Sequence, residues 1–117
     1  GIEEFMDNIQ ESVDLLIQQI RESEIGQRYL EQEEKLSIDP ELKERVDQFR
    51  RLNFNLQRSS EQDSLLEASE QLVMESRELR MNPQVNAYLD AELALCKLIQ
   101  KICMRLTNET GIRTPDL

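Results

Sequence analysis

The sequence predicts an all-α fold, a bundle of about four to five helices with a long C-terminal helix, and it predicts that the fold forms oligomers. Apolar residues recur three and four positions apart through most of the chain, as they do on one face of a helix. Only three Gly and three Pro occur in 117 residues, too few for the many turns of an all-β protein. A short chain with 38% hydrophobic and 32% charged residues has a thin core on its own, so we expect it to self-associate.

The first segment has a clear amphipathic pattern. Its aliphatic side chains are Ile9, Val13, Leu16, Ile17 and Ile20. They stack on one face of a helix, which predicts a helix that packs by that face. Gly26 weakens a helix by about 1 kcal/mol relative to Ala, so we expect a bend or short break over residues 24–27.

Two Asx-Pro pairs mark helix starts. Asp39 and Asn82 offer side-chain oxygens to the free amides of a new helix. Pro40 and Pro83 suit the first helical position, where no N–H is needed. The polar stretch 58–63 favours another stop, but it contains no Gly or Pro, so a continuous helix there stays open.

The last helix has the most regular pattern. We expect it to run from Pro83 to about Asn108, about 39 Å at 1.5 Å per residue. Its broad apolar face is predicted to be both the central packing element and the subunit interface. The predicted interface residues are Val85, Leu89, Cys96, Ile99, Cys103 and Leu106. We expect Gly111 to end the helix, which gives one domain over residues 1–110 and a flexible tail over 111–117.

Composition excludes several kinds of function. The chain has no His, which excludes Ser-His-Asp and Cys-His catalysis and His-ligated zinc. Its net charge of 14 − 24 = −10 argues against direct nucleic-acid binding, and residues 1–36 carry 3 − 10 = −7 of it. No apolar run approaches the ~20 residues of a membrane span, and the acidic start lacks the basic region of a signal peptide. We therefore expect a cytoplasmic protein that does not bind membranes.

The two cysteines lie seven residues apart on one helical face. Cys96 and Cys103 are about 10 Å apart along the axis, too far to form a disulfide with each other. We expect them to be buried as small apolar residues. The alternative, a metal or cluster between subunits, needs further ligands because a closed site takes four.

No motif indicates catalysis. Glu92 falls in the apolar stripe, but no nucleophile, phosphate loop or oxyanion motif accompanies it. We therefore expect no enzyme activity, no small-molecule substrate, and no catalytic, cofactor-binding or metal-binding residues. Basic and aromatic residues mix only around Arg50, Arg51 and Arg58, where we expect ion pairs with neighbouring acids.

The order of these motifs resembles a known family. After the amphipathic first helix come Glu22-Ser23-Glu24, Tyr29-Leu30, Asp39-Pro40-Glu41-Leu42 and a helix that contains Phe49. The most telling stretch runs from Asn82-Pro83-Gln84-Val85 to Asp90-Ala91-Glu92. Over roughly residues 5–107 the chain resembles the YlbF/YmcA (YheA-like) family of small bacterial helical regulators.

The resemblance implies long helices that associate into dimers or higher oligomers, and a regulator that is not an enzyme. Relatives act in competence, biofilm formation and sporulation, as parts of a complex that modulates the endoribonuclease RNase Y. Some relatives are linked to iron–sulfur clusters through cysteines. This chain offers only Cys96 and Cys103, and we expect no cofactor.

We therefore expect a regulatory adaptor that binds copies of itself and other proteins of a regulatory complex. The alternative from the sequence is a structural coiled-coil or helical oligomerisation module with no regulatory role.

Overall fold

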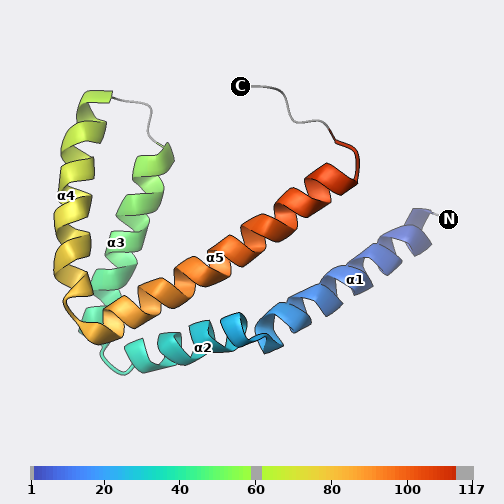
Figure 1. Ribbon diagram of the computed structural model, residues 1–117, viewed down its shortest axis with the longest axis horizontal. Helices are drawn as coiled ribbons and strands as arrows, with labels where there is room; N and C mark the ends of the chain where they lie inside the picture. The colour runs from blue at the N-terminus through green and yellow to red at the C-terminus, as the bar shows by residue number, and fades with distance from the viewer. Residues whose placement is uncertain (1, 59–61, 113–117) are drawn as a thin grey trace. The chain divides into compact units, whose positions relative to one another are not determined.

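The computed structural model describes the backbone of residues 2–58 and 62–112 and the side chains of residues 7–56 and 66–112. Over these ranges the chain forms five helices and no strand, which confirms the predicted all-α fold. The helices are α1 (Ile2–Glu22), α2 (Glu24–Leu36), α3 (Pro40–Arg58), α4 (Gln62–Arg80) and α5 (Pro83–Glu109), as Figure 1 shows. None of the helices described is both long and apolar enough to cross a membrane.

The chain divides into two compact units. One unit is residues 31–90, and the other joins residues 1–30 to residues 91–117. Helices α2 and α5 each contribute residues to both units. The expectation of a single domain over residues 1–110 stays a prediction.

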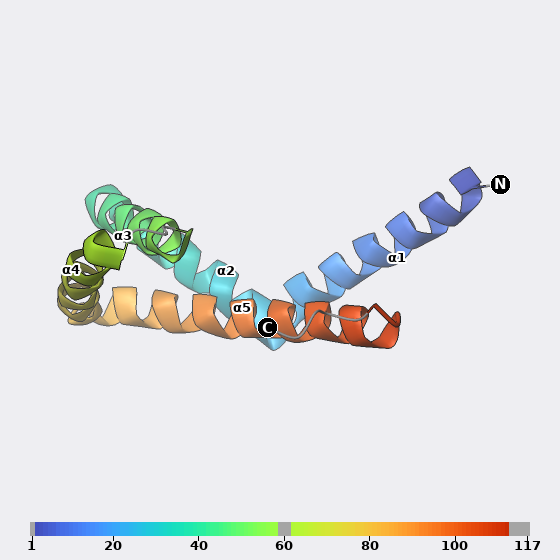
Figure 2. The same cartoon turned by 90° about the horizontal axis from the view of Figure 1, so that it is seen from above.

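The unit of residues 31–90 contains most of the buried core. In it α3 and α4 lie side by side, as the views in Figures 1 and 2 agree. The fully or nearly fully buried side chains of this unit come from four helices and are Leu36, Val46, Leu79, Val85, Tyr88 and Leu89. Arg45 of α3 adds ion pairs at 3.4 Å to Glu75 and 3.5 Å to Glu78 on α4. This core holds the start of α5 in place.

Both Asx-Pro pairs begin helices as predicted. Asp39 Oδ1 accepts a hydrogen bond from the Leu42 amide at 3.2 Å, and Pro40 is the first residue of α3. Asn82 Oδ1 accepts from the amides of Gln84 and Val85 at 2.9 and 3.4 Å. The carboxamide thus satisfies two amides at the start of α5 that have no partner within the helix.

The predicted break in the first segment lies at Ser23, between α1 and α2. The Ser23 hydroxyl donates to the Ile20 carbonyl and accepts from the Gly26 amide at 3.0 Å, so it joins the two helix ends. The side chain of Gln27 donates to the Arg21 carbonyl at 2.7 Å. A Cβ on Gly26 would lie 2.0 Å from the Ile20 carbonyl oxygen. The bend therefore depends on glycine for space as well as for helix weakness.

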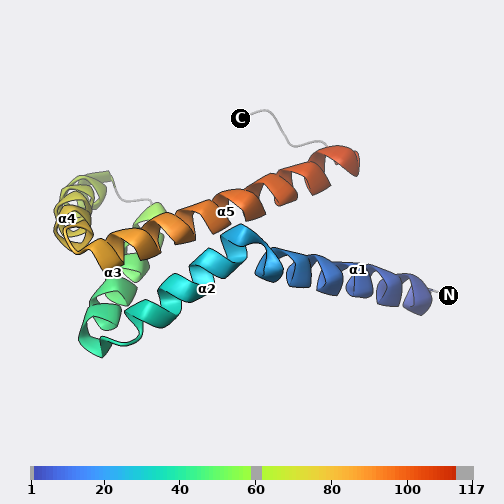
Figure 3. The same ribbon diagram turned by 60° about the horizontal axis from the view of Figure 1, so that its bottom comes forward.

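Helix α5 is 27 residues long. Figure 3 shows it as one continuous helix. It ends close to the predicted position, and Gly111 follows with φ +84°, a left-handed conformation that glycine adopts at little cost. Residues 113–117, most of the predicted tail, lie outside the described residues.

Candidate interaction surface

The six predicted interface residues fall into two groups along α5. Val85 and Leu89 are buried inside the unit of residues 31–90, with exposed fractions of 0% and 6%. The other four, Cys96, Ile99, Cys103 and Leu106, are exposed. The same stripe thus begins in the core of one unit and continues as surface in the other.

The exposed side chains of the stripe are uncharged, and its one charged member, Glu92, is half-buried. We call Leu93, Cys96, Ile99, Cys103 and Leu106 the α5 strip; Ile99 is 44% and Leu106 57% exposed. Helical geometry places Gln100 and Thr107 on the same face, and neither carries a charge. Such a face matches the depletion of charged residues at the centre of protein interfaces.

Basic residues follow a neighbouring side of α5. Lys97, Lys101 and Arg105 come at four-residue steps and are exposed. Lys97 follows Leu93 by one helical turn, so the basic row borders the α5 strip. Arg105 also pairs with Glu109 at 3.3 Å.

Helix α1 has a second unpartnered apolar face. We call Ile9, Val13, Leu16, Ile17 and Ile20 the α1 row. Ile9, Val13 and Ile17 are exposed, and Leu16 and Ile20 are half-buried. A helix that is amphipathic yet exposed on its apolar side is typical of one that packs against another chain.

The cysteines are exposed, so the prediction that they are buried is wrong for the single chain. They lie in the α5 strip, which the described part of the chain leaves uncovered. Nowhere among the described residues do three or more His, Cys, Asp or Glu gather closely enough to hold a metal ion.

The predicted ion pairs of the basic and aromatic segment on α3 are present where the side chains are described. Arg50 pairs with Asp47 at 3.6 Å, and Arg51 pairs with Glu44 at 3.3 Å. Arg50 also lies 6.0 Å from the centre of the Tyr88 ring, a contact that the sequence analysis missed. The side chain of Arg58 lies outside the described residues.

Sequence reasoning also missed three hydrogen bonds that tie α5 to other helices. Arg80 donates to Asn86 at 2.7 Å and to Asp90 at 3.0 Å. The side chains of Gln84 and Gln32 are hydrogen-bonded at 2.8 Å, which links α5 to α2. Asn86 and Asp90 are four residues apart on one helical face, and this spacing could have predicted one basic side chain in contact with both.

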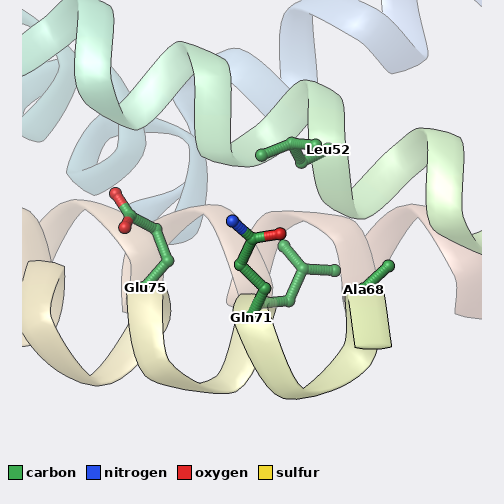
Figure 4. Close-up of a pocket in the computed structure, with 5 residues that line it drawn as sticks. Leu52, Ala68, Gln71 and Glu75 are labelled. Atoms are coloured by element: carbon green, nitrogen blue, oxygen red, sulfur yellow. The ribbon is translucent and has the colours of Figure 1, made fainter. Parts of the chain in front are cut away.

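A small hollow lies between α3 and α4. Its lining residues are Leu52, Ala68, Gln71, Leu72 and Glu75. Figure 4 shows Ala68, Gln71 and Glu75 on the side of α4 that faces α3, with Leu52 opposite them on α3. Its volume of about 80 Å³ is well below the ~300 Å³ of a small-molecule site.

Comparison with known proteins gives one result. A family model described as "Control of competence regulator ComK, YlbF/YmcA" matches residues 9–109. The searches of curated proteins and of solved structures gave no match.

Proposed function

The chain belongs to the YlbF/YmcA family, and on that premise we propose that it is a cytoplasmic regulatory adaptor. The family description, control of the competence regulator ComK, supports a regulatory role in competence. In this proposal the protein acts by binding copies of itself and other proteins, and it makes or breaks no covalent bonds. The absence of His from the whole sequence and of any nucleophile motif supports a role without catalysis.

One observation carries this proposal: the α5 strip is apolar and exposed, although it continues a stripe that is buried at its start. Exposed apolar surface of this kind is stabilised when another protein covers it. The finer role implied by the family resemblance, modulation of RNase Y within a complex, is part of the proposal.

Self-association is tested first, by light scattering on the full chain over a range of concentrations. Ile99→Asp places a charge in the centre of the α5 strip. Because Ile99 is already 44% exposed, this change should leave helix content and the melting temperature of the isolated chain nearly unchanged. It should weaken assembly at least about tenfold, since a charge buried at an interface costs more than 1.4 kcal/mol.

The matched control is Asn108→Asp, which adds the same charge to an exposed position of α5 outside the strip. We expect it to assemble like the wild type. Equal assembly of Ile99→Asp and Asn108→Asp would show that the strip is not an interface.

Regulation is tested in the native host. Deleting the gene should lower competence, and the wild-type chain and Asn108→Asp should restore it while Ile99→Asp does not. A pull-down with the wild-type chain as bait should retain RNase Y or a protein bound to it. An assembled protein whose deletion leaves competence unchanged would favour the structural oligomerisation module instead.

A further inference from the structure

We propose that α1 of one copy packs its apolar row on the α5 strip of a second copy, and that the second copy returns the same contact. The α5 strip of each copy is thus covered by the α1 row of the other copy. This inference rests on the self-association proposed above and specifies the surfaces that carry it.

The two faces are complementary in charge. Described residues 7–22 of α1 carry one base against four acids, a net charge of 1 − 4 = −3. Residues 91–112 of the α5 end carry three bases against two acids, a net charge of 3 − 2 = +1. The chain as a whole has a charge of −10, so the α5 end is a basic surface on an acidic protein. Two acidic α1 helices would repel each other, whereas α1 beside α5 is attractive.

The charged side chains border the apolar faces. Asp14 precedes Ile17 of the α1 row by three residues, and Asp7, seven residues before Asp14, lies on the same side of the helix. On α5, Lys97 follows Leu93 by four residues, and Lys101 is the next member of the basic row. Charges at the edges of an apolar helix seam set partner choice and orientation, which is the role we assign to these four residues.

The area is compatible with a dimer. Six large apolar side chains of the α1 row and the α5 strip are between 43% and 59% exposed. They are Ile9, Val13, Ile17, Leu93, Ile99 and Leu106. At half exposure each offers roughly 60 Å² of apolar surface, or about 360 Å² per chain. Because slightly more than half of an interface is apolar, this corresponds to roughly 600 Å² per partner, at the low end of specific complexes.

The reciprocal arrangement uses both faces in one closed dimer. If α1 covered only its partner's α1, the basic row would gain no opposite charge and the α5 strip would stay exposed. A reciprocal contact related by a two-fold axis covers both faces of both copies. Neither face stays free to bind a third chain, so assembly stops at the dimer.

Charge exchange between two full-length variants tests the contact. One variant carries Asp7→Lys and Asp14→Lys, and the other carries Lys97→Glu and Lys101→Glu. Each homodimer would place like charges together at both contacts. Each variant alone should therefore dimerise about tenfold more weakly than the wild type at low salt. An equal mixture should form a heterodimer near wild-type strength, because every contact in it again joins opposite charges.

The mixture distinguishes contact between copies from contact within one chain. If α1 packed on α5 of its own chain, mixing would restore nothing, whereas one chain carrying all four changes would recover; that result would overturn the inference. A matched control, Glu67→Lys with Glu70→Lys on exposed positions of α4, has the same net charge as the first variant and should dimerise like the wild type.

The remaining outcomes separate this inference from the proposed function. A wild-type dimer that Ile99→Asp weakens but that neither charge variant affects would keep self-association and overturn the α1–α5 pairing. A wild-type chain that stays monomeric at every concentration would overturn both.

Discussion

Replacement of Gly26 by Ala tests the reasoning about the bend between α1 and α2. A Cβ at this position would lie 2.0 Å from the Ile20 carbonyl oxygen and 3.0 Å from the Arg21 carbonyl oxygen. Both atoms belong to the backbone, so no flexible side chain can move aside. On helix propensity alone Gly→Ala is favourable by about 1 kcal/mol.

The clash should outweigh the gain in propensity. Forcing a methyl group into an occupied position costs about 1–3 kcal/mol, because the backbone at the end of α1 has to shift. The hydrogen bond from the Gly26 amide to Ser23 Oγ, 3.0 Å long, would be strained by the same shift. We expect a net loss of about 1 kcal/mol in the free energy of unfolding.

Thermal unfolding followed by circular dichroism at fixed protein concentration measures this loss, since association makes the melting temperature depend on concentration. A loss of about 1 kcal/mol lowers the melting temperature by roughly 4–8 °C in a small domain. Arg28→Ala, two residues further along α2 at an exposed position, is the control and should stay within about 0.5 kcal/mol of the wild type. A Gly26→Ala protein with an unchanged or higher melting temperature would refute the argument, because the gain in helix propensity would then equal or exceed the cost of the steric clash.

Three further changes test the other unit. Asn82→Ala should lower the free energy of unfolding by about 1 kcal/mol, because two amides of α5 lose their acceptor. Asn82→Asp keeps an acceptor oxygen and should retain most of the wild-type stability; urea denaturation measures both variants. Val46→Ala removes a fully buried side chain and should cost about 2 kcal/mol by the same measurement, whereas Val73→Ala, at 57% exposure, should cost less than about 0.5 kcal/mol. Asp90→Ala breaks the ion pair with Arg80, but its carboxylate is mostly exposed, so urea denaturation should show a change below about 1 kcal/mol; larger losses would mean that this pair organises the start of α5.

The sequence was most informative where structure depends on neighbouring residues. Asp39-Pro40 and Asn82-Pro83 begin helices because the cap and the ring act within one turn, and such effects are local. The break near Gly26 was also predicted, but for helix weakness only. The close approach to the Ile20 carbonyl depends on the direction of α1, which no residue spacing reveals.

Burial along α5 could not be predicted from the sequence. Val85, Leu89, Cys96 and Ile99 occupy one helical stripe and look equivalent by spacing. The first two are buried because the unit of residues 31–90 packs around them, and that packing depends on tertiary contacts distant in sequence. The cysteines were expected in a core for the same reason, yet they lie past the point where the chain covers its own helix.

Helix α5 therefore has two different roles within one continuous element. Residues 83–90 belong to the unit of residues 31–90, where the caps of Asn82, the Arg80 contacts and buried Val85 fix the start of the helix. Residues 84–109 contain no Gly or Pro, so the helix has no built-in kink beyond that start. In the other unit the helix continues to Glu109, and its period of 3.6 residues determines which side of α5 presents the strip and which side presents the basic row. A protein that recognises partners through a helix face gains from this arrangement, because a face held in register binds without the entropy cost of ordering a flexible segment.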